Sequence, residues 1–378
     1  MASSALEVKA EIQRFDFERA RSSTVASMTH TAFRFGTTDS YLTPIALGAM
    51  VFGTRTPEDE ARRILDHFIS EVTPRYSAPD GTAARGMVDT ADCYSWWDVR
   101  GEYGGHSESV LGRWFADSGS RDAVFLSTKG TALIDDIDAV WQGDEQAHWS
   151  IVASHFVGAS PAVLRESLSA SLDRLGVDSV DLYYNHVDDR RTPLAESLET
   201  FASFVADGRI GAYGWSNVPT WRLAQIRAIA EANGWPQPAA LQQEHSYLRR
   251  RAGLRHTSIT SDEQLDYLET YPDLQLVAYS PVTKGLFSDT SRRSPDFPNM
   301  GPFAGPDAEA RFEAVDRVAA ASGATGNQVV LAWMMAGTAP RVLPLIGPRT
   351  WSQYTECIEA LDVTLTTDQL ADLDAAGA

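Results

Sequence analysis

The sequence has little lysine, little cysteine and no long apolar run. Lysine occurs only at Lys9, Lys129 and Lys284, so 29 of the 32 basic residues are arginine. The two cysteines, Cys93 and Cys357, cannot build a disulfide framework, and this favours a reducing, cytoplasmic setting. No segment approaches the run of about 18 apolar residues that marks a membrane-spanning helix, so no membrane span is predicted.

Positive charge as a whole is scarce. The chain carries 51 acidic residues against 32 basic ones, and its formal net charge is −19. Nucleic acids and anionic membranes bind proteins through basic surfaces, so neither is an expected partner. A small molecule is the expected partner, and an anionic one would need a few well-placed cations. Nothing in the sequence indicates an oligomeric state.

Several common catalytic motifs are also missing. The chain has no G-x-G-x-x-G after a first strand and no G-x-x-x-x-G-K-[ST], which removes the main support for a Rossmann or P-loop protein. It has no H-E-x-x-H, no zinc-spaced cysteine pair and no G-x-S-x-G elbow. No metal site is therefore predicted.

Short apolar segments and amphipathic helical segments alternate from about Ile45 onward. This alternation over roughly 300 residues predicts an α/β fold, a (β/α)8 TIM barrel, with a doubly wound parallel sheet as the alternative. The expected strands end near Met50, Ala91, Lys129, His186, Asn217, Glu244, Ser280 and Gly347. The expected helices cover residues 57–70, 107–117, 161–175, 194–207, 219–232, 262–270, 308–322 and 351–361.

The chain is expected to form one barrel domain over residues 31–378, preceded by an extension over residues 1–30. Residues 32–35 are expected to form a strand that caps the bottom of the barrel. The connections 131–159 and 283–307 are unusually long, and both leave the carboxyl end of a strand, where barrels build active sites. We expect them to act as lids or pocket walls; plain surface loops are the alternative.

Four polar side chains stand at or just beyond the ends of three expected strands. They are Asp89, Tyr94, Lys129 and His186. An acid, a phenol, an amine and an imidazole at one edge of a parallel sheet are suited to proton transfer. Taken singly, each has a structural alternative, such as a core tyrosine or a core histidine whose hydrogen bonds are satisfied.

An ordered series of motifs around these residues resembles the aldo-keto reductase superfamily. The branch it is most similar to contains the potassium-channel β-subunits and bacterial relatives. The resemblance covers roughly residues 43–363. The motifs are Leu47–Gly53, Asp89–Tyr94, Gly105–Gly112, Ser127–Lys129, Asp181–His186, Gly214–Asn217, Gln242–Ser246, Ala278–Pro281 and Ile346–Thr350.

The resemblance implies that the protein reduces an aldehyde or ketone to an alcohol. Tyr94 would be the general acid, and His186 would hydrogen-bond the substrate oxygen. A free tyrosine, with a pKa of about 10, matches neutral pH poorly. Lys129 is expected to lower this pKa through its charge, and Asp89 to orient the lysine.

The resemblance also implies a nicotinamide cofactor, NADPH in preference to NADH. Arg349 would supply the permanent planar charge that binds a 2′-phosphate. Cys357 replaces an asparagine of the family, and Asp289 stands where relatives carry glycine, so Arg292 or Arg293 is expected to replace a phosphate contact. The expected cofactor-binding residues are Gly48, Met50, Ser216, Asn217, Gln242, Tyr279, Ser280, Pro281, Val282, Lys284, Gly285, Leu286, Gly347, Arg349, Gln353 and Glu356.

Tryptophans gather in the expected loops near Tyr94. Trp96, Trp97, Trp141 and Trp149 are expected to line a pocket for an aromatic, polyketide-like or sugar-derived substrate. Packing of the loops against each other is the alternative. Two other functions stay open: a slow redox sensor of the channel-subunit type that binds NADP(H), and a metal-dependent hydrolase using His186, Asp189 and Asp89.

Overall fold

The computed structural model describes residues 31–144, 147–294, 296–297, 300–337 and 339–377, so the extension 1–30 lies outside the described residues. Eight parallel strands close into a barrel in the order β10-β3-β4-β5-β6-β7-β8-β9. This confirms the predicted (β/α)8 barrel and excludes the open, doubly wound sheet. The strands are β3 (Ala46–Gly48), β4 (Gly86–Asp89), β5 (Val124–Gly130), β6 (Val180–Asn185), β7 (Ile210–Ser216), β8 (Ala240–Glu244), β9 (Gln275–Tyr279) and β10 (Val342–Ile346).

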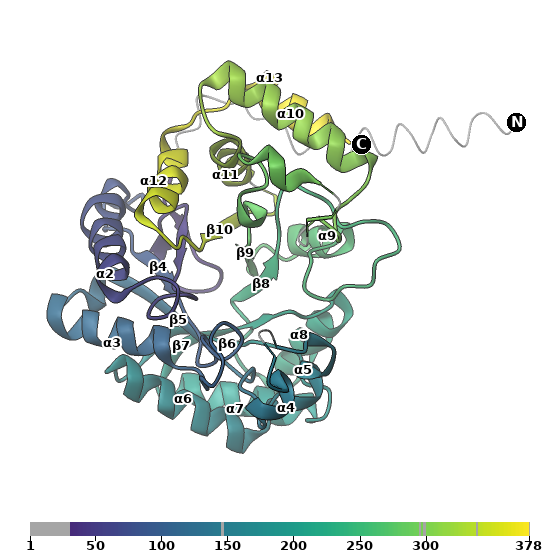
Figure 1. Cartoon of the computed structure of the whole chain (residues 1–378). Helices are drawn as coiled ribbons and strands as arrows, with labels where there is room; N and C mark the ends of the chain where they lie inside the picture. The colour runs from purple at the N-terminus through teal and green to yellow at the C-terminus, as the bar shows by residue number, and fades with distance from the viewer. Residues whose placement is uncertain (1–30, 145–146, 295, 298–299, 338, 378) are drawn as a thin grey trace, which may run out of the picture.

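Helices surround the strands, as Figure 1 shows. The helices that follow the eight strands in this ring are α2 (Glu58–His67), α3 (His106–Ser118), α6 (Pro161–Leu175), α7 (Leu194–Ala206), α8 (Thr220–Asn233), α9 (Asp262–Thr270), α11 (Gly326–Ala336) and α12 (Trp351–Glu359). Short η1 (Phe68–Val72) and η2 (Thr73–Arg75) extend α2, η3 (Arg121–Ala123) precedes β5, and η6 (Ala360–Asp362) extends α12.

The strands are buried because each one has the barrel interior on one face and helices on the other. β6 illustrates the alternation: Leu182 and Tyr184 belong to the apolar cluster of the interior, whereas Tyr183 packs in the layer between strands and helices. α6 illustrates a helix whose limits are visible in the sequence. The Ser160 side chain accepts a hydrogen bond from the Val163 amide at its start, and Gly176 ends it in a left-handed conformation.

One helix of the ring was assigned wrongly from the sequence. The expected seventh helix, residues 308–322, is observed as α10 (Pro306–Ser322), but it packs on α11 and α13 (Thr367–Ala375) outside the ring. The position next to β10 belongs to α11, which the sequence analysis did not predict. Most of its residues are buried and its apolar side chains are not confined to one stripe, so the usual helical periodicity is missing.

A small hairpin closes the amino end of the barrel. β1 (Phe33–Arg34) pairs antiparallel with β2 (Tyr41–Leu42), in agreement with the expected capping strand. Phe35 is fully buried, and its ring centroid lies 5.1 Å from that of Phe125 in the barrel interior. The opposite, carboxyl end of the barrel remains available for a site.

Both long connections contain secondary structure of their own. The segment after β5 forms α4 (Ile137–Trp141) and α5 (Trp149–His155), and the segment after β9 forms η4 (Thr283–Gly285) and η5 (Thr290–Arg293). The first segment packs on the loop after β4 in one apolar cluster that includes Tyr94, Trp96, Trp141 and Val152. In the part of the chain that the structure describes, no helix is both long and apolar enough to span a bilayer.

Close contact between α3 and α6 depends on Gly112. A β-carbon at this position would lie 2.2 Å from the backbone oxygen of Arg174, which cannot move away as a flexible side chain could. We expect Gly112→Ala to lower the free energy of unfolding by about 1–3 kcal/mol through overpacking. Gly337→Ala is the matched control, because among the described residues its β-carbon would meet Met334 O alone, at 3.4 Å. Denaturant unfolding measures both variants, and equal stability would contradict the prediction.

Candidate functional site

The four side chains expected to transfer a proton lie together at the carboxyl ends of three neighbouring strands. Asp89 is the last residue of β4, Lys129 is the last but one of β5, and His186 follows β6 directly. Because β4, β5 and β6 are adjacent and parallel, their carboxyl ends meet at one edge. Tyr94 comes from the turn that follows β4.

The ammonium group of Lys129 is completely buried and has three acceptors. Its Nζ donates to Asp89 Oδ2 at 2.5 Å, to Thr90 O at 2.7 Å and to the Tyr94 hydroxyl at 2.7 Å. An ammonium has three N–H donors, so its hydrogen-bonding capacity is filled. A buried charge is tolerated under such conditions, because it is both paired and fully hydrogen-bonded.

Asp89 is held as firmly as the lysine it pairs with. Its Oδ1 accepts hydrogen bonds from Ser127 Oγ at 2.6 Å and from Gln242 Nε2 at 3.1 Å. These donors come from β5 and β8, so the carboxylate is fixed from two sides of the barrel. The position of the Lys129 ammonium group is fixed as a result.

The contact with Lys129 determines where the Tyr94 proton can point. An ammonium can only donate, so the Tyr94 oxygen must be the acceptor of this hydrogen bond. The phenolic O–H is then directed away from Lys129 and is available to another acceptor. Tyr94 lines the large cavity at this end of the barrel, where a substrate oxygen could take that role.

The pKa of the Tyr94 phenol lies well above its ordinary value, because burial and then the nearby Asp89 carboxylate disfavour the phenolate. This direction is opposite to the one expected from the sequence. The reason is that Asp89 neutralises the Lys129 charge within the same pair, so little net positive charge remains to stabilise a phenolate. Tyr94 is therefore protonated at neutral pH, which is the state that a proton donor requires.

His186 lies beside Tyr94, with ring centroids 5.8 Å apart and nearly perpendicular planes. Removal from bulk water and then the Lys129 charge hold the pKa of its imidazole well below the ordinary value, so the ring is neutral at pH 7. Its Nδ1 lies 3.3 Å from Cys93 Sγ, and the Asn217 side chain donates to its backbone oxygen at 2.8 Å. Cys93 thus contacts the ring itself, and Asn217 fixes the backbone that carries it.

A cavity of about 1230 Å³ opens above these residues. Asp89, Tyr94 and His186 line it, while Lys129 lies behind them. All the expected cofactor-binding residues except Leu286 also line it: Gly48, Met50, Ser216, Asn217, Gln242, Tyr279, Ser280, Pro281, Val282, Lys284, Gly285, Gly347, Arg349, Gln353 and Glu356. Leu286 is instead fully buried in the apolar cluster beneath α10 and α11.

Strained backbone marks the same cavity wall. Asn217, Ser280 and Lys284 have φ values of 54°, 53° and 55°, a left-handed conformation that costs a non-glycine residue energy. The Asn217 amide oxygen accepts a hydrogen bond from the Tyr279 hydroxyl at 2.9 Å. Such strain persists where the surroundings fix it, and it is frequent at ligand sites.

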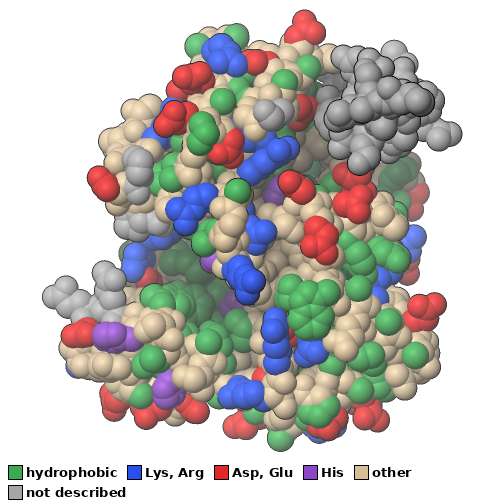
Figure 2. All heavy atoms as spheres, turned by 90° about the vertical axis from the view of Figure 1, so that its right-hand side faces the viewer, with side chains coloured by type: hydrophobic (Ala, Val, Ile, Leu, Met, Phe, Trp, Pro, Cys, Tyr) green, Lys and Arg blue, Asp and Glu red, His purple; other side chains and the backbone are tan. Residues whose placement is uncertain are grey.

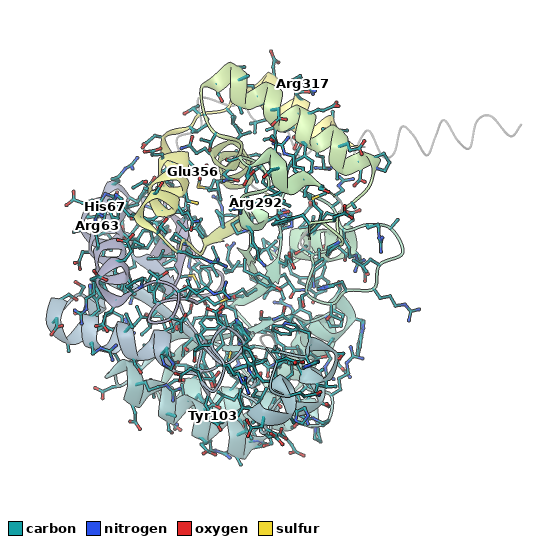
Figure 3. All side chains as sticks on the ribbon, viewed as in Figure 1. Arg63, His67, Tyr103, Arg292, Arg317 and Glu356 are labelled. Carbon is teal, nitrogen blue, oxygen red and sulfur yellow. The ribbon has the colours of Figure 1, made fainter. Side chains whose placement is uncertain are left out.

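The chemistry of the upper part of the cavity fits a large phosphorylated ligand. Lys284, Arg292 and Arg349 all line it. Arg292 comes from η5 and Glu356 from α12 (Figure 3). Asn327 lines the cavity as well, and its buried Oδ1 has no hydrogen-bond partner among the residues that the structure describes. Of the two arginines considered in the sequence, Arg292 faces the cavity, whereas Arg293 pairs with Asp316 at 2.6 Å.

Three of the four tryptophans predicted to line the substrate pocket lie in the cavity lining, and the fourth packs behind them. Trp96, Trp97 and Trp149 line the cavity, and Trp149 is 62% exposed. Trp141 does not line it: this residue is buried, and its indole N–H donates to Trp96 O at 2.9 Å. The packing alternative therefore describes Trp141, and Phe156 lines the cavity in its neighbourhood.

No group of three or more histidine, cysteine or carboxylate residues could hold a metal ion among the residues described. Asp189, one of the ligands considered for a metal-dependent hydrolase, holds the loop after β6 instead. Its oxygens accept hydrogen bonds from the Ala159 amide at 2.9 Å and from the Thr192 hydroxyl at 2.8 Å. This arrangement offers no support for the hydrolase alternative.

Comparison with known proteins agrees with the geometry. The family model named aldo/keto reductase family matches residues 44–378. The chain belongs to the aldo/keto reductase family. It is therefore an oxidoreductase, and its family acts on small-molecule carbonyl compounds with nicotinamide cofactors.

Similar proteins come from bacteria and fungi. An uncharacterised oxidoreductase, YrpG, of Bacillus subtilis is 30% identical over 90% of this chain and 93% of its own length. Norsolorinic acid reductase A of Aspergillus parasiticus is 26% identical over 88% of this chain and 77% of its own. The aldo-keto reductase str7 of Strobilurus tenacellus is 27% identical over 73% of this chain and 75% of its own.

The sequence analysis missed some residues that shape this aldo/keto reductase's site. Cys93 contacts His186, Ser127 and Thr90 complete the Asp89–Lys129 hydrogen bonds, and Asn327 faces the upper cavity. In the sequence, Cys93 counts as one of two cysteines and falls inside the Asp89–Tyr94 motif, and neither fact indicates a contact with His186. Ser127 precedes Lys129 by two residues on the same strand, so strand periodicity could have placed both side chains on one face.

Proposed function

We propose that the protein reduces an aldehyde or ketone with NADPH, with Tyr94 as the general acid. The observation that carries this proposal is the hydrogen bond from Lys129 Nζ to the Tyr94 hydroxyl, which leaves the phenolic proton free to be donated into the cavity. A bound nicotinamide would supply the hydride. The protein would supply the proton and the orientation of the carbonyl group.

The roles of the four residues follow from their contacts. Tyr94 would donate its proton to the carbonyl oxygen as negative charge develops there. The neutral His186 ring would stand beside the same oxygen and align it, so that the two side chains form an oxyanion pocket. Lys129, held by Asp89, would keep its hydrogen bond to the Tyr94 oxygen after the transfer, so the phenolate would not be left without a donor until the tyrosine is protonated again.

The lining of the cavity supports one orientation for the cofactor. Ser216, Asn217 and Gln242 would hydrogen-bond the nicotinamide carboxamide near Tyr94, and Tyr279 would stack on the ring. Ser280, Pro281, Val282, Lys284 and Gly285, together with Gly48 and Met50, would surround the pyrophosphate side. Gly347, Arg349, Gln353 and Glu356 would hold the adenosine end. Arg349, with Lys284 and Arg292 nearby in the lining, favours the 2′-phosphate of NADPH.

The substrate is proposed to be an aromatic carbonyl compound. Tyr94, Trp97 and Trp149 present flat apolar faces, with the Tyr94 and Trp97 centroids 5.4 Å apart. Such faces select flat rings. One relative, the aryl-alcohol dehydrogenase GME11368 of Pestalotiopsis microspora, is 26% identical over 76% of this chain and 68% of its own length, and its name supports the same substrate class.

Tyr94→Phe removes the proposed proton donor but keeps the ring. We expect turnover of an aromatic aldehyde to fall by about 10²- to 10⁴-fold, the usual share of general acid catalysis. NADPH binding, followed by fluorescence titration, should change by less than about twofold, because the hydroxyl serves the substrate. Tyr103→Phe, at a residue that is 64% exposed, is the control and should keep full activity.

Tight NADPH binding without any turnover by the wild type would instead favour a redox sensor.

The pKa directions predict a flat pH profile for reduction. Tyr94, with its pKa raised above 10.0, stays protonated throughout the neutral and alkaline range. His186, with its pKa lowered below 6.5, stays neutral down to that pH. We therefore expect kcat/KM for carbonyl reduction to show no inflection between pH 6.5 and 10 that belongs to either group. An alkaline decrease in kcat/KM in that window, absent from a substrate-binding control, would show that Lys129 lowers the Tyr94 pKa after all.

Arg349→Ala tests the cofactor preference. Loss of a charge-assisted contact with the 2′-phosphate should raise the Kd for NADPH by about 10- to 100-fold and leave that for NADH nearly unchanged. Arg63→Ala is the matched control, because the Arg63 guanidinium lies over the Trp351 ring, 3.9 Å from its centroid, and Arg63 is not among the described residues that line the cavity. Equal weakening of both cofactors in Arg349→Ala would remove the argument for NADPH.

A further inference from the structure

The segment that joins β8 to α9 carries an unusual charge for this protein. Residues 245–261 contain no aspartate or glutamate, yet they include Arg249, Arg250, Arg251 and Arg255. The chain as a whole has a net charge of −19, which disfavours the approach of anions. A concentrated basic segment in such a chain provides a local field of the opposite sign.

Two of these arginines face a second cavity. It has a volume of about 540 Å³ and lies between the first residues of α8 and the first residues of α9. Arg250, Arg255 and His256 line it together with Trp221. Among the described lining residues, Glu263 is the one carboxylate. On the side of the molecule that Figure 2 shows, several lysine and arginine side chains lie near a hollow lined by hydrophobic side chains.

The second cavity adjoins the large one. Pro219, Thr257 and Ser258 line both of them. Near this boundary Trp221 is 55% exposed, and the guanidinium of Arg190, which lines the large cavity, lies 5.2 Å from the centroid of its ring. A ligand whose reacting end lies beside Tyr94 could thus extend over this boundary.

The base of the basic segment is fixed to the barrel rather than loose. Gln243 Nε2 donates to Thr257 O at 2.8 Å, and the Glu244 amide donates to Ser258 O at 2.8 Å. The residue before these, Gln242, lines the large cavity and contacts Asp89. Consecutive residues of β8 therefore contact both the basic segment and the Asp89 carboxylate of the proposed proton-transfer site.

Neither arginine of the second cavity is neutralised within the residues that the structure describes. Arg250 donates to the backbone oxygen of His256 at 2.9 Å, and neither Arg250 nor Arg255 forms an ion pair there. Neighbouring arginines differ: Arg222 pairs with Asp188 at 3.1 Å and Arg227 with Asp273 at 2.9 Å. The charges of Arg250 and Arg255 thus remain available to a ligand.

We infer that the second cavity is a subsite for an oxyanion group, a carboxylate or a phosphate, on the carbonyl substrate. The planar guanidinium groups of Arg250 and Arg255 match such groups in charge and in geometry. The reacting carbonyl would lie beside Tyr94, and Trp221 would flank the part of the molecule between the two ends. This inference rests on the proposed carbonyl reduction, and it narrows the substrate class to anionic aromatic carbonyl compounds.

Binding is the first test, because it does not require turnover. The probes are 4-formylbenzoate and the longer 4′-formylbiphenyl-4-carboxylate, each beside its neutral methyl ester. Calorimetry gives the Kd of each probe for the full chain, with and without NADP+. We expect at least one acid to bind about tenfold more tightly than its ester, and the Arg250→Gln/Arg255→Gln variant to lose this preference. Arg165→Gln, at an exposed arginine of α6, is the control for charge alone and should keep it.

Steady-state kinetics with NADPH separate this inference from the proposed function. The double variant should reduce the esters at the wild-type rate and lose about tenfold in kcat/KM for the preferred acid, and added salt should reproduce part of that loss. The subsite would be overturned if the wild type reduced the esters normally but showed no preference for the acids. It would also be overturned if the double variant kept the preference for the acids. Both outcomes would leave the proposed carbonyl reduction standing. Acid binding that depends on the two arginines without any turnover would keep the subsite and count against the reductase.

Discussion

The buried ion pair between Lys129 and Asp89 is the interaction on which the rest of the site depends. Burying two charges is expensive, and it is tolerated here because every donor of the lysine has an acceptor and both carboxylate oxygens have donors. That requirement fixes the strand ends of β4, β5 and β8 relative to each other. It also forces the Tyr94 oxygen to act as an acceptor. The direction of the phenolic proton is thus a consequence of charge burial inside a closed barrel.

The same pair explains why the residues around Tyr94 carry little net charge. The two charges cancel, Tyr94 is protonated and His186 is neutral, so the floor of the cavity carries little net charge. Charge is instead concentrated away from the floor, at Arg349 and its neighbours on one side and at the basic segment after β8 on the other. A ligand with anionic ends and a neutral reacting centre suits this distribution.

Much of the fold could be predicted from the sequence because barrel strands and caps leave local signals. α6 and α9 have the bounds expected from their caps and periodicity. α11 left no such signal, because a helix buried on most sides lacks an amphipathic stripe. α10 shows the opposite problem: its stripe was visible in the sequence, but a stripe does not reveal whether it faces strands or other helices.

The sequence indicated which residues form the site, but it did not indicate the pKa of Tyr94 or which tryptophans line the cavity. Residue types and their order brought Asp89, Lys129 and His186 to one edge, because parallel strands align their ends. The pKa of Tyr94 depends on how much of the lysine charge is neutralised, and that depends on three-dimensional contacts. In the same way, the sequence does not distinguish Trp141 from Trp96. The packing of the loops places Trp96 in the cavity lining and Trp141 behind it, where its indole N–H donates to Trp96 O.

The scarcity of lysine has a practical consequence once burial is considered. Lys129 is inaccessible, so Lys284 is the one exposed lysine side chain within the described residues. It lies in the lining of the large cavity. Amine-directed reagents label most proteins at many surface positions. Among the described lysines of this protein, they would modify Lys284 in the large cavity. The extent to which Lys284 is labelled, measured by mass spectrometry, would therefore show whether a ligand occupies the large cavity, without any engineered label.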